Sequence, residues 1–311
     1  MSTYVKKEDG TLIESDTEVV KVESDNLSKI LKNKTNGQYF FGTYNGSILP
    51  ELDEDAFANL TNINYMFYNC SKITNLFNLK FDKATSSESL FSNCNNLTEI
   101  NVELPLSTNM NSCFVNCSKL KNINLNIGTQ SISLNNMFSY CDELESITIN
   151  KELIATSCEG MFIDCKKLKT IPQINTSNVT DFRNMFFGCN FEITPLIDTS
   201  KATDIRNMFS QYGLFEKSIL KVISAYDFSN VIYATGMVKN AINLEQFLPT
   251  GLKVSFDLSV STKFTREALV VVLNNLGTPT STQTLTLGST NLAKLTEEDI
   301  AIATEKNWTL Q

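Results

Sequence analysis

Cysteine is the residue type in this chain that most plainly invites a chemical interpretation. The sequence holds eight cysteines and no histidine. Cys113 and Cys117 are spaced closely enough to bind one metal ion together. A disulfide framework is a second possibility, because a chain with this many cysteines could pair them with one another.

The spacing of the cysteines favours a third interpretation, in which they are small core residues. Six of them recur at steps of about 24 residues, and the other two fall on apolar positions of the same repeat. Residues stacked on parallel strands leave their Cβ atoms about 4.8 Å apart, outside the usual ~3.5–4.5 Å of a disulfide. We therefore predict free, buried thiols, with a disulfide and a zinc site as the alternatives.

Catalytic constellations are hard to build from the remaining residues. Without histidine there can be no Ser-His-Asp or Cys-His arrangement and no histidine-ligated zinc. Paired carboxylates could work as in a glycosidase, but the acids lie in runs such as 53–55 and 297–299, which are typical of solvated corners and helix starts. No glycine-rich phosphate loop occurs. We predict a protein that is not an enzyme and has no catalytic, cofactor-binding or metal-binding residues.

Two binding features remain open. The loops are rich in Asn, Ser and Thr, which could bind sugars, but chain corners need the same residues. Arg183 and Arg206 occupy equivalent positions in adjacent repeats and could form a basic strip. The simpler interpretation is that they pair with Asp181 and Asp204.

The element that positions all of these residues is a repeat that extends from residue 63 to residue 247. Aligned on an aromatic anchor, its copies carry Phe or Val at position 0, Cys or a substitute at +3, and usually an apolar residue at +6. The anchors are Phe67, Phe91, Phe114, Phe138, Phe162, Phe186, Phe209 and Val238. The +3 residues are Cys70, Cys94, Cys117, Cys141, Cys165, Cys189, Tyr212 and Ala241. We assign the Phe and Cys residues of these two columns to the structural core of the repeat.

The pattern within one repeat predicts a coil with two kinds of local structure. The 0, +3, +6 spacing is typical of one face of a short helical or 3₁₀ turn. The +9 position, occupied by Ile100, Ile123, Ile147 and Ile171, lies in a segment that predicts a short strand with one face inward. A period of this length indicates a solenoid, whose coils bury their apolar sides against their neighbours. The fold class is therefore an α/β repeat solenoid of about eight coils with a parallel sheet.

The run Asp198-Thr-Ser-Lys-Ala-Thr-Asp-Ile-Arg-Asn-Met-Phe, like the copy that begins at Asn175, resembles the BspA-like family of leucine-rich repeats. That family occurs on bacterial surfaces and in phage tail proteins. The resemblance covers residues 57–250 and implies a curved right-handed solenoid with a binding surface. Tyr212 and Ala241 depart from the pattern, and about five residues are inserted between Phe209 and Val238, so we expect a bulge there.

The flanking regions are expected to close the solenoid. Residues 1–56 do not fit the repeat and predict an N-terminal cap or attachment region, with strands at 19–22 and 38–42 and a helix at 26–32. Residues 56–60 could be a truncated first coil. Residues 251–311 predict a capping unit with a helix at 265–277, a strand at 284–288 and a helix at 296–306. This unit resembles the segment that follows such repeats in phage structural proteins.

Charge and hydropathy narrow the functional classes. The net charge of −8 disfavours nucleic acid and anionic lipid as partners, and no stretch reaches the ~20 apolar residues of a membrane span. The first ten residues lack an apolar run typical of a signal peptide, so we expect the protein to stay inside its cell or to leave by lysis within a particle.

The resemblance and the lack of a signal-peptide pattern together favour a phage virion protein of the tail or baseplate that acts in binding or host recognition. Its expected partners are other virion proteins and a host surface glycan or protein, with several copies on each particle. A bacterial surface adhesin is the alternative, and a glycan-degrading enzyme on a β-solenoid is a third hypothesis.

Overall fold

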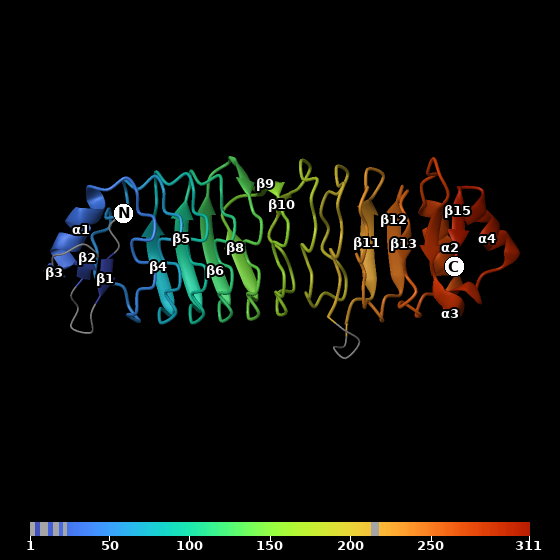
Figure 1. The fold of residues 1–311 in the computed structure, drawn as a ribbon, viewed down its shortest axis with the longest axis horizontal. Coiled ribbons are helices and arrows are strands. Elements are labelled where there is room, and N and C mark those ends of the chain that lie inside the picture. The colour runs from blue at the N-terminus through green and yellow to red at the C-terminus, as the bar shows by residue number, and fades with distance from the viewer. Residues whose placement is uncertain (1–3, 7–11, 15–18, 21–23, 213–217) are drawn as a thin grey trace. The chain divides into compact units, whose positions relative to one another are not determined.

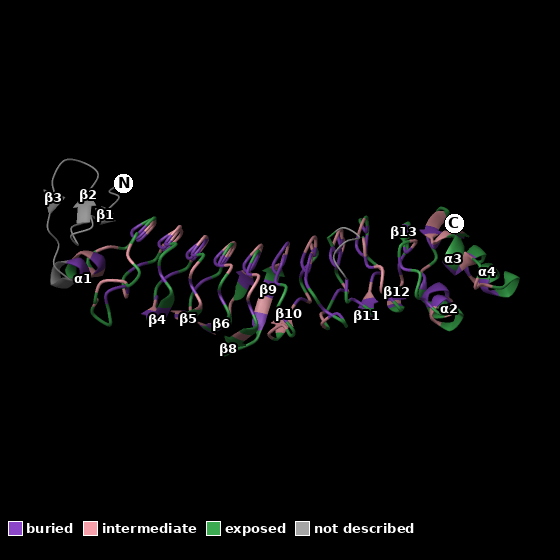
Figure 2. Ribbon diagram, turned by 90° about the horizontal axis from the view of Figure 1, so that it is seen from below, coloured by how far each residue is buried: buried purple, intermediate pink, exposed green. Residues whose placement is uncertain are grey.

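The structure, a computed structural model, describes residues 4–6, 12–14, 19–20, 24–212 and 218–311. The chain forms two compact units. The first consists of Met1–Ile154, Cys165–Lys167 and Ile171–Gln173, and the second of Ala155–Asp164, Leu168–Thr170 and Ile174–Gln311. Both are built from repeated coils (Figure 1), in which buried and exposed stretches alternate (Figure 2). The fold class predicted from the repeat, a leucine-rich-repeat solenoid with parallel sheets, is confirmed.

The first unit begins with a small antiparallel sheet and continues with a parallel one. The antiparallel strands are β1 (Tyr4–Lys6), β2 (Leu12–Glu14) and β3 (Val19–Val20), and helix α1 (Ser24–Lys32) follows them. The parallel sheet contains β4 (Asn75–Lys80), β5 (Glu99–Leu104), β6 (Asn122–Ile127) and β8 (Ser146–Ile149) in that order. The remaining short strands are β7 (Ser131–Ser133), β9 (Leu153–Ser157) and β10 (Ile174–Asn175), of which the last two lie where the chain passes between units.

The register of the parallel sheet places the same repeat position opposite itself. Ile100 lies opposite Ile123, and Ile123 lies opposite Ile147. Ile100 and Ile123 are buried, whereas Ile147 is half-buried because β8 is the last strand of this sheet. Ile171, also expected in a strand, is half-buried and lies in none.

The segment around each anchor is a row of tight turns, and the prediction of a helical or 3₁₀ turn is wrong. Around Phe67, the N–H groups of Met66, Tyr68 and Cys70 each donate to the carbonyl three residues earlier, at 3.0–3.2 Å. Tyr65 and Asn69, however, have φ values of 58° and 59°. A 3₁₀ helix keeps φ negative, whereas a type II turn has a positive φ at its third residue.

The same left-handed backbone recurs throughout the repeats. All residues two positions before an anchor have positive φ, and they are Tyr39, Tyr65, Ser89, Ser112, Asn136, Gly160, Asn184, Asn207 and Gly236. Most residues two positions after an anchor also have a positive φ. Asn and Gly recur at both positions because they enter the left-handed region at the least cost.

The positive φ values let alternate backbone N–H groups reach the next coil. Ile63, Tyr65, Phe67 and Asn69 donate to the carbonyls of Ser86, Glu88, Leu90 and Ser92 at 2.9–3.3 Å. Other coils within each unit repeat this pattern, which we call the turn ladder. The side chains at positions −4, −1, 0 and +3 of each coil, such as Ile63, Met66, Phe67 and Cys70, face inward and form the core.

The core of each coil is a stacked ring with a thiol beside it. In the first unit, Phe67, Phe91, Phe114 and Phe138 stack with centroids 5.3–5.5 Å apart. Each +3 cysteine donates its thiol to the anchor carbonyl of the preceding coil, as Cys141 does to Phe114 at 3.1 Å. That carbonyl points away from the turn ladder into the core, so the thiol supplies a donor that a methyl group could not. All eight cysteines are free and buried.

The repeat begins one coil earlier than residue 63, where the sequence pattern placed its start. Phe41 stacks on Phe67 at 5.1 Å, and Asn36 bridges Asn62, so residues 36–44 follow the repeat, and the strand expected at 38–42 is a set of turns. Residues 56–60, predicted to be a truncated first coil, are instead the end of this coil. Phe57 packs on Phe81 of the next coil, with ring centroids 5.0 Å apart. A capping or attachment role for the residues before it stays a prediction.

The second unit contains further coils and a helical end. Phe162, Phe186 and Phe209 stack at 5.4–5.7 Å, and β11 (Val222–Asp227) pairs in parallel with β12 (Gln246–Thr250). The expected insertion bulge falls on residues 213–217, which lie outside the described residues.

The helix, strand and second helix expected at the C-terminal end are confirmed. The elements are β13 (Phe256–Asp257), α2 (Arg266–Asn275), β14 (Gln283–Thr286), α3 (Gly288–Leu292), α4 (Glu297–Thr304) and β15 (Trp308–Leu310). The three strands form a parallel sheet. Thr265 caps α2, Thr296 and Asp299 form a capping box on α4, and Arg266 joins the two helices through a pair with Asp299 at 2.7 Å.

Replacing Phe114 by Ala tests the stacked core. We expect the free energy of unfolding to fall by ~3–5 kcal/mol, because the ring is fully buried between two others. Phe77→Ala is the matched control, since this ring in β4 is 56% exposed and should cost under ~1 kcal/mol. Urea unfolding of both variants measures the difference, and equal losses would contradict the assigned core.

The buried thiols predict a loss of stability at alkaline pH. Burial raises the thiol pKa of Cys113, Cys117 and Cys141, and raises that of Cys158 to about 12. Above the ordinary thiol pKa of about 8.5, the unfolded chain releases these protons while the folded chain retains them. The thiol contribution is therefore complete below pH ~8.5 and declines as pH rises, by up to ~1.4 kcal/mol per pH unit for each thiol.

Denaturant unfolding between pH 8 and 11 measures this slope. Cys113→Ala removes one titrating thiol, so its slope should be shallower than that of the natural sequence. Identical slopes would mean that the thiols do not stay protonated in the folded chain.

Candidate binding surface

The residues singled out by the sequence lie inside the molecule. The core Phe and Cys side chains of the two columns are all buried, with exposed fractions of 2% or less. They shape the coils and cannot touch a ligand directly. Among the residues that the structure describes, no group of three or more Cys, Asp or Glu side chains could hold a metal ion. A binding site must therefore be sought on the outer side of the coils.

Three tyrosines form the most distinctive outer feature of the first unit. Tyr39 and Tyr65 occupy the same position in adjacent coils and stack with centroids 4.8 Å apart. Tyr68 packs edge-on against both rings, at 6.5 Å from Tyr39 and 5.9 Å from Tyr65. Tyr39 is 38% exposed and the other two are half-buried. We call Tyr39, Tyr65 and Tyr68 the tyrosine platform.

The backbone beneath the platform is unfavourable for these side chains. Tyr39 and Tyr65 have φ values of 57° and 58°, in the left-handed region that bulky residues rarely adopt. Later coils place Ser89, Ser112 or Asn136 at this position. The fold therefore accepts small polar residues there, and packing alone does not require the two aromatic rings.

Polar side chains border the platform on the side of the next coil. The Tyr65 hydroxyl donates to Glu88 at 3.3 Å. Burial, followed by the nearby Glu88 charge, raises the pKa of Tyr65, so this hydroxyl remains a donor at neutral pH. Asn64 accepts from the Ser86 hydroxyl and from the Glu88 backbone N–H at 2.7 and 2.9 Å. The platform thus combines aromatic rings with a fixed carboxylate and amide groups.

The second unit carries a ladder of ion pairs rather than a basic strip. Arg183 pairs with Asp181 at 2.7 Å and with Glu159 at 3.0 Å, and Arg206 pairs with Asp204 at 2.5 Å. The predicted pairing is therefore confirmed. Burial alone would raise the pKa of Asp181, but the hydrogen bonds from Arg183 outweigh it and lower that pKa.

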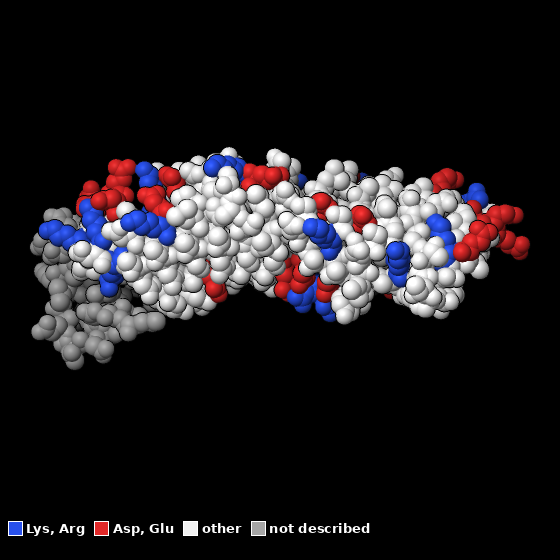
Figure 3. Space-filling model, turned by 90° about the horizontal axis from the view of Figure 1, so that it is seen from above, with Lys and Arg blue, Asp and Glu red and all other residues white. Residues whose placement is uncertain are grey.

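Charge elsewhere is also balanced locally. On the face shown in Figure 3, Lys and Arg lie beside Asp and Glu in small mixed groups. Lys166 pairs with Asp142 at 2.9 Å and Lys167 with Glu143 at 2.5 Å. The visible face offers no extended region of a single sign, so a partner would be selected mainly by shape and local hydrogen bonding.

The sequence contained a signal for the platform that was missed. Tyr39 and Tyr65 become equivalent only when residues 36–44 are recognised as a coil, and that coil has no cysteine at +3 to identify it. No helix in the described part of the chain is long and apolar enough to cross a membrane.

Comparison with known proteins identifies two regions. The family described as BspA type leucine rich repeat region matches residues 61–194, in six copies. The family described as Mycoplasma protein of unknown function, DUF285, matches residues 156–266. No curated protein and no solved structure matches the chain.

Replacing Tyr65 by Asn tests whether the platform is dispensable for folding. Asn relieves the left-handed strain by ~1 kcal/mol, while the lost ring contacts cost ~0.5–1.5 kcal/mol, so the net change should stay within ~1 kcal/mol. Tyr68→Asn is the control, because Tyr68 has no positive φ to relieve and should be the more destabilising change. Thermal unfolding compares them, and the reverse order would show that folding requires the Tyr65 ring.

Proposed function

Residues 61–194 of this chain belong to the BspA-type leucine-rich repeat family, and we propose that the protein is a non-enzymatic binding module that engages a partner protein through the tyrosine platform. Repeats of this type indicate an interaction or surface role. The observation that carries the proposal is the position of Tyr39 and Tyr65, whose rings are displayed from a backbone that favours smaller residues.

The chemistry of the platform suits a protein partner. Tyrosine is enriched among residues that dominate binding energy, because its ring gives contact area at a low entropy cost and its hydroxyl gives a hydrogen bond. Mutual packing already restricts the three rings, so little freedom remains to be lost on binding. Glu88 and Asn64, held by their own hydrogen bonds, add polar contacts of fixed direction.

The double variant Tyr39→Asn, Tyr65→Asn tests the platform directly. Cells that bind the fluorescently labelled natural protein are identified first. The affinity of the double variant for these cells should be about tenfold lower or more, as expected for a cluster that dominates binding. Tyr140→Asn is the matched control, because Tyr140 is also exposed, with a φ of 62°, but lies in another column. Equal binding by all three proteins would exclude the platform.

A more specific proposal concerns where such binding takes place. We propose a phage virion protein of the tail or baseplate that recognises the host surface, present in several copies and in contact with other virion proteins. The resemblance of the C-terminal unit to the segment that follows such repeats in phage structural proteins supports this proposal. Several copies on one particle would convert weak single contacts into firm attachment.

A bacterial surface protein is the second candidate. The DUF285 match favours it, since that family is described from Mycoplasma. Antibodies against residues 63–247 distinguish the two. Labelling of virions at the tail end, together with slower adsorption, supports the phage proposal. Labelling of bacterial cells that carry no phage genes would replace it with the surface protein.

A further inference from the structure

The turn ladder ends in the second unit with a row of backbone donors that no coil covers. Earlier in this unit, each coil accepts hydrogen bonds from the turn N–H groups of the coil before it. The N–H groups of Ile205, Asn207, Phe209 and Gln211 donate to the carbonyls of Tyr233, Thr235, Met237 and Lys239 at 2.8–3.2 Å. In the next coil, the corresponding donors are the N–H groups of Ala234, Gly236, Val238 and Asn240. None of these four has an acceptor among the described residues.

The chain leaves these donors open because its next segment follows another course. Phe256 and Asp257 of β13 pair with Leu285 and Thr286 of β14, so their strand bonds lie on the far side from residues 234–240. Contact with the last coil is made instead by the Ser261 hydroxyl, which donates to the Ala241 carbonyl at 3.0 Å. At the end of the 234–240 segment, this one side-chain hydrogen bond takes the place of the backbone hydrogen bonds of the turn ladder.

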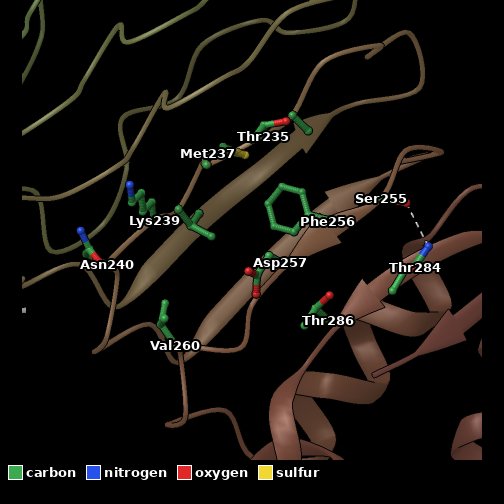
Figure 4. Close-up of a pocket in the computed structure, with 13 residues that line it drawn as sticks. Thr235, Met237, Lys239, Asn240, Ser255, Phe256, Asp257, Val260, Thr284 and Thr286 are labelled. Carbon is green, nitrogen blue, oxygen red and sulfur yellow. Dashed lines mark hydrogen bonds between the residues drawn. The ribbon is translucent and has the colours of Figure 1, made fainter. Parts of the chain in front are cut away.

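A cavity of about 500 Å³ lies at this point. Residues 234–240 line it on one side, and β13, β14 and Val260 line it on the other. In Figure 4 the Phe256 ring lies between the 234–240 segment and the two β14 threonines, Thr284 and Thr286. The volume is within the ~300–1,000 Å³ of typical ligand sites. The anchor of this coil is Val238, whose side chain is smaller than the Phe that earlier coils carry at the same position.

We propose that this cavity binds an extended peptide segment of a partner protein, which adds its backbone to the open edge of the turn ladder. Within each unit, the ladder acceptors are carbonyls at alternate positions of the next coil. The four open donors are also at alternate positions, so a peptide backbone matches them one by one. A single phosphate or carboxylate would need donors that converge on one point.

The lining defines the side chains that such a segment would carry. Met237, Phe256 and Val260 form an apolar part that would take an aliphatic side chain. Thr284 and Thr286 add hydroxyls, and the exposed Lys239 and Asp257 have opposite charges, so the site has no preference for a charged peptide. This site is separate from the tyrosine platform, and its failure would leave the proposed function intact.

The probe is a synthetic peptide of residues 232–242 of this chain, because this segment presents the carbonyls that fill the same ladder one coil earlier. Added to the full-length protein, it should bind saturably below ~1 mM. Hydrogen exchange at the four open amides, followed by NMR, should slow at least tenfold on binding.

Two variants locate the binding. Val260→Trp fills the cavity from an exposed position and should weaken the peptide at least tenfold. Val271→Trp alters an equally exposed valine on α2 outside this cavity and should change binding less than twofold. Absence of saturable binding, binding without protection of the four amides, or equal binding by both variants would overturn the proposal. Equal protection by inorganic phosphate would instead make the cavity an anion site.

Discussion

The left-handed backbone on both sides of each anchor is the constraint on which the rest of the structure depends. A positive φ at these positions turns alternate N–H groups toward the next coil, so the turns of one coil are hydrogen-bonded to the turns of its neighbour. This backbone also directs the anchor ring and the +3 thiol of each coil inward. The rings of Phe91 and Phe114 consequently stack at 5.3 Å, and the Cys117 thiol reaches the Phe91 carbonyl at 3.2 Å. Stacking and thiol bonding follow from the backbone geometry.

Several features could be predicted from the sequence because they depend on spacing alone. The period fixed the column of anchors, the inward direction of the cysteines and the parallel register of residues such as Ile100 and Ile123. The helices at the C-terminal end were marked by capping residues, Thr265 and Thr296, whose effect is local. Each of these inferences needed only the pattern of side chains within a short window.

Other features were hidden because one pattern permits two backbones. Apolar residues at 0, +3 and +6 are compatible with a helical turn, and only the frequent Asn and Gly residues at −2 and +2 distinguish a row of type II turns. The first coil was missed since Phe41 is followed by Tyr44 where later coils have cysteine. The tyrosine platform depends on that coil and was missed with it. The cavity beside residues 234–240 requires the course of β13, which no sequence pattern indicated.

The turn ladder also has a direction. Within each unit, the turn N–H groups of one coil donate to the carbonyls of the coil after it, so every coil has a donor side and an acceptor side. A coil added to or removed from the interior presents the same two sides to its neighbours. The number of coils can therefore change by duplication or deletion of one repeat without any change to the segments that close the array. The length of the array can thus change in evolution independently of its stability. The outward side chains can also diverge while the turn ladder beneath them stays the same.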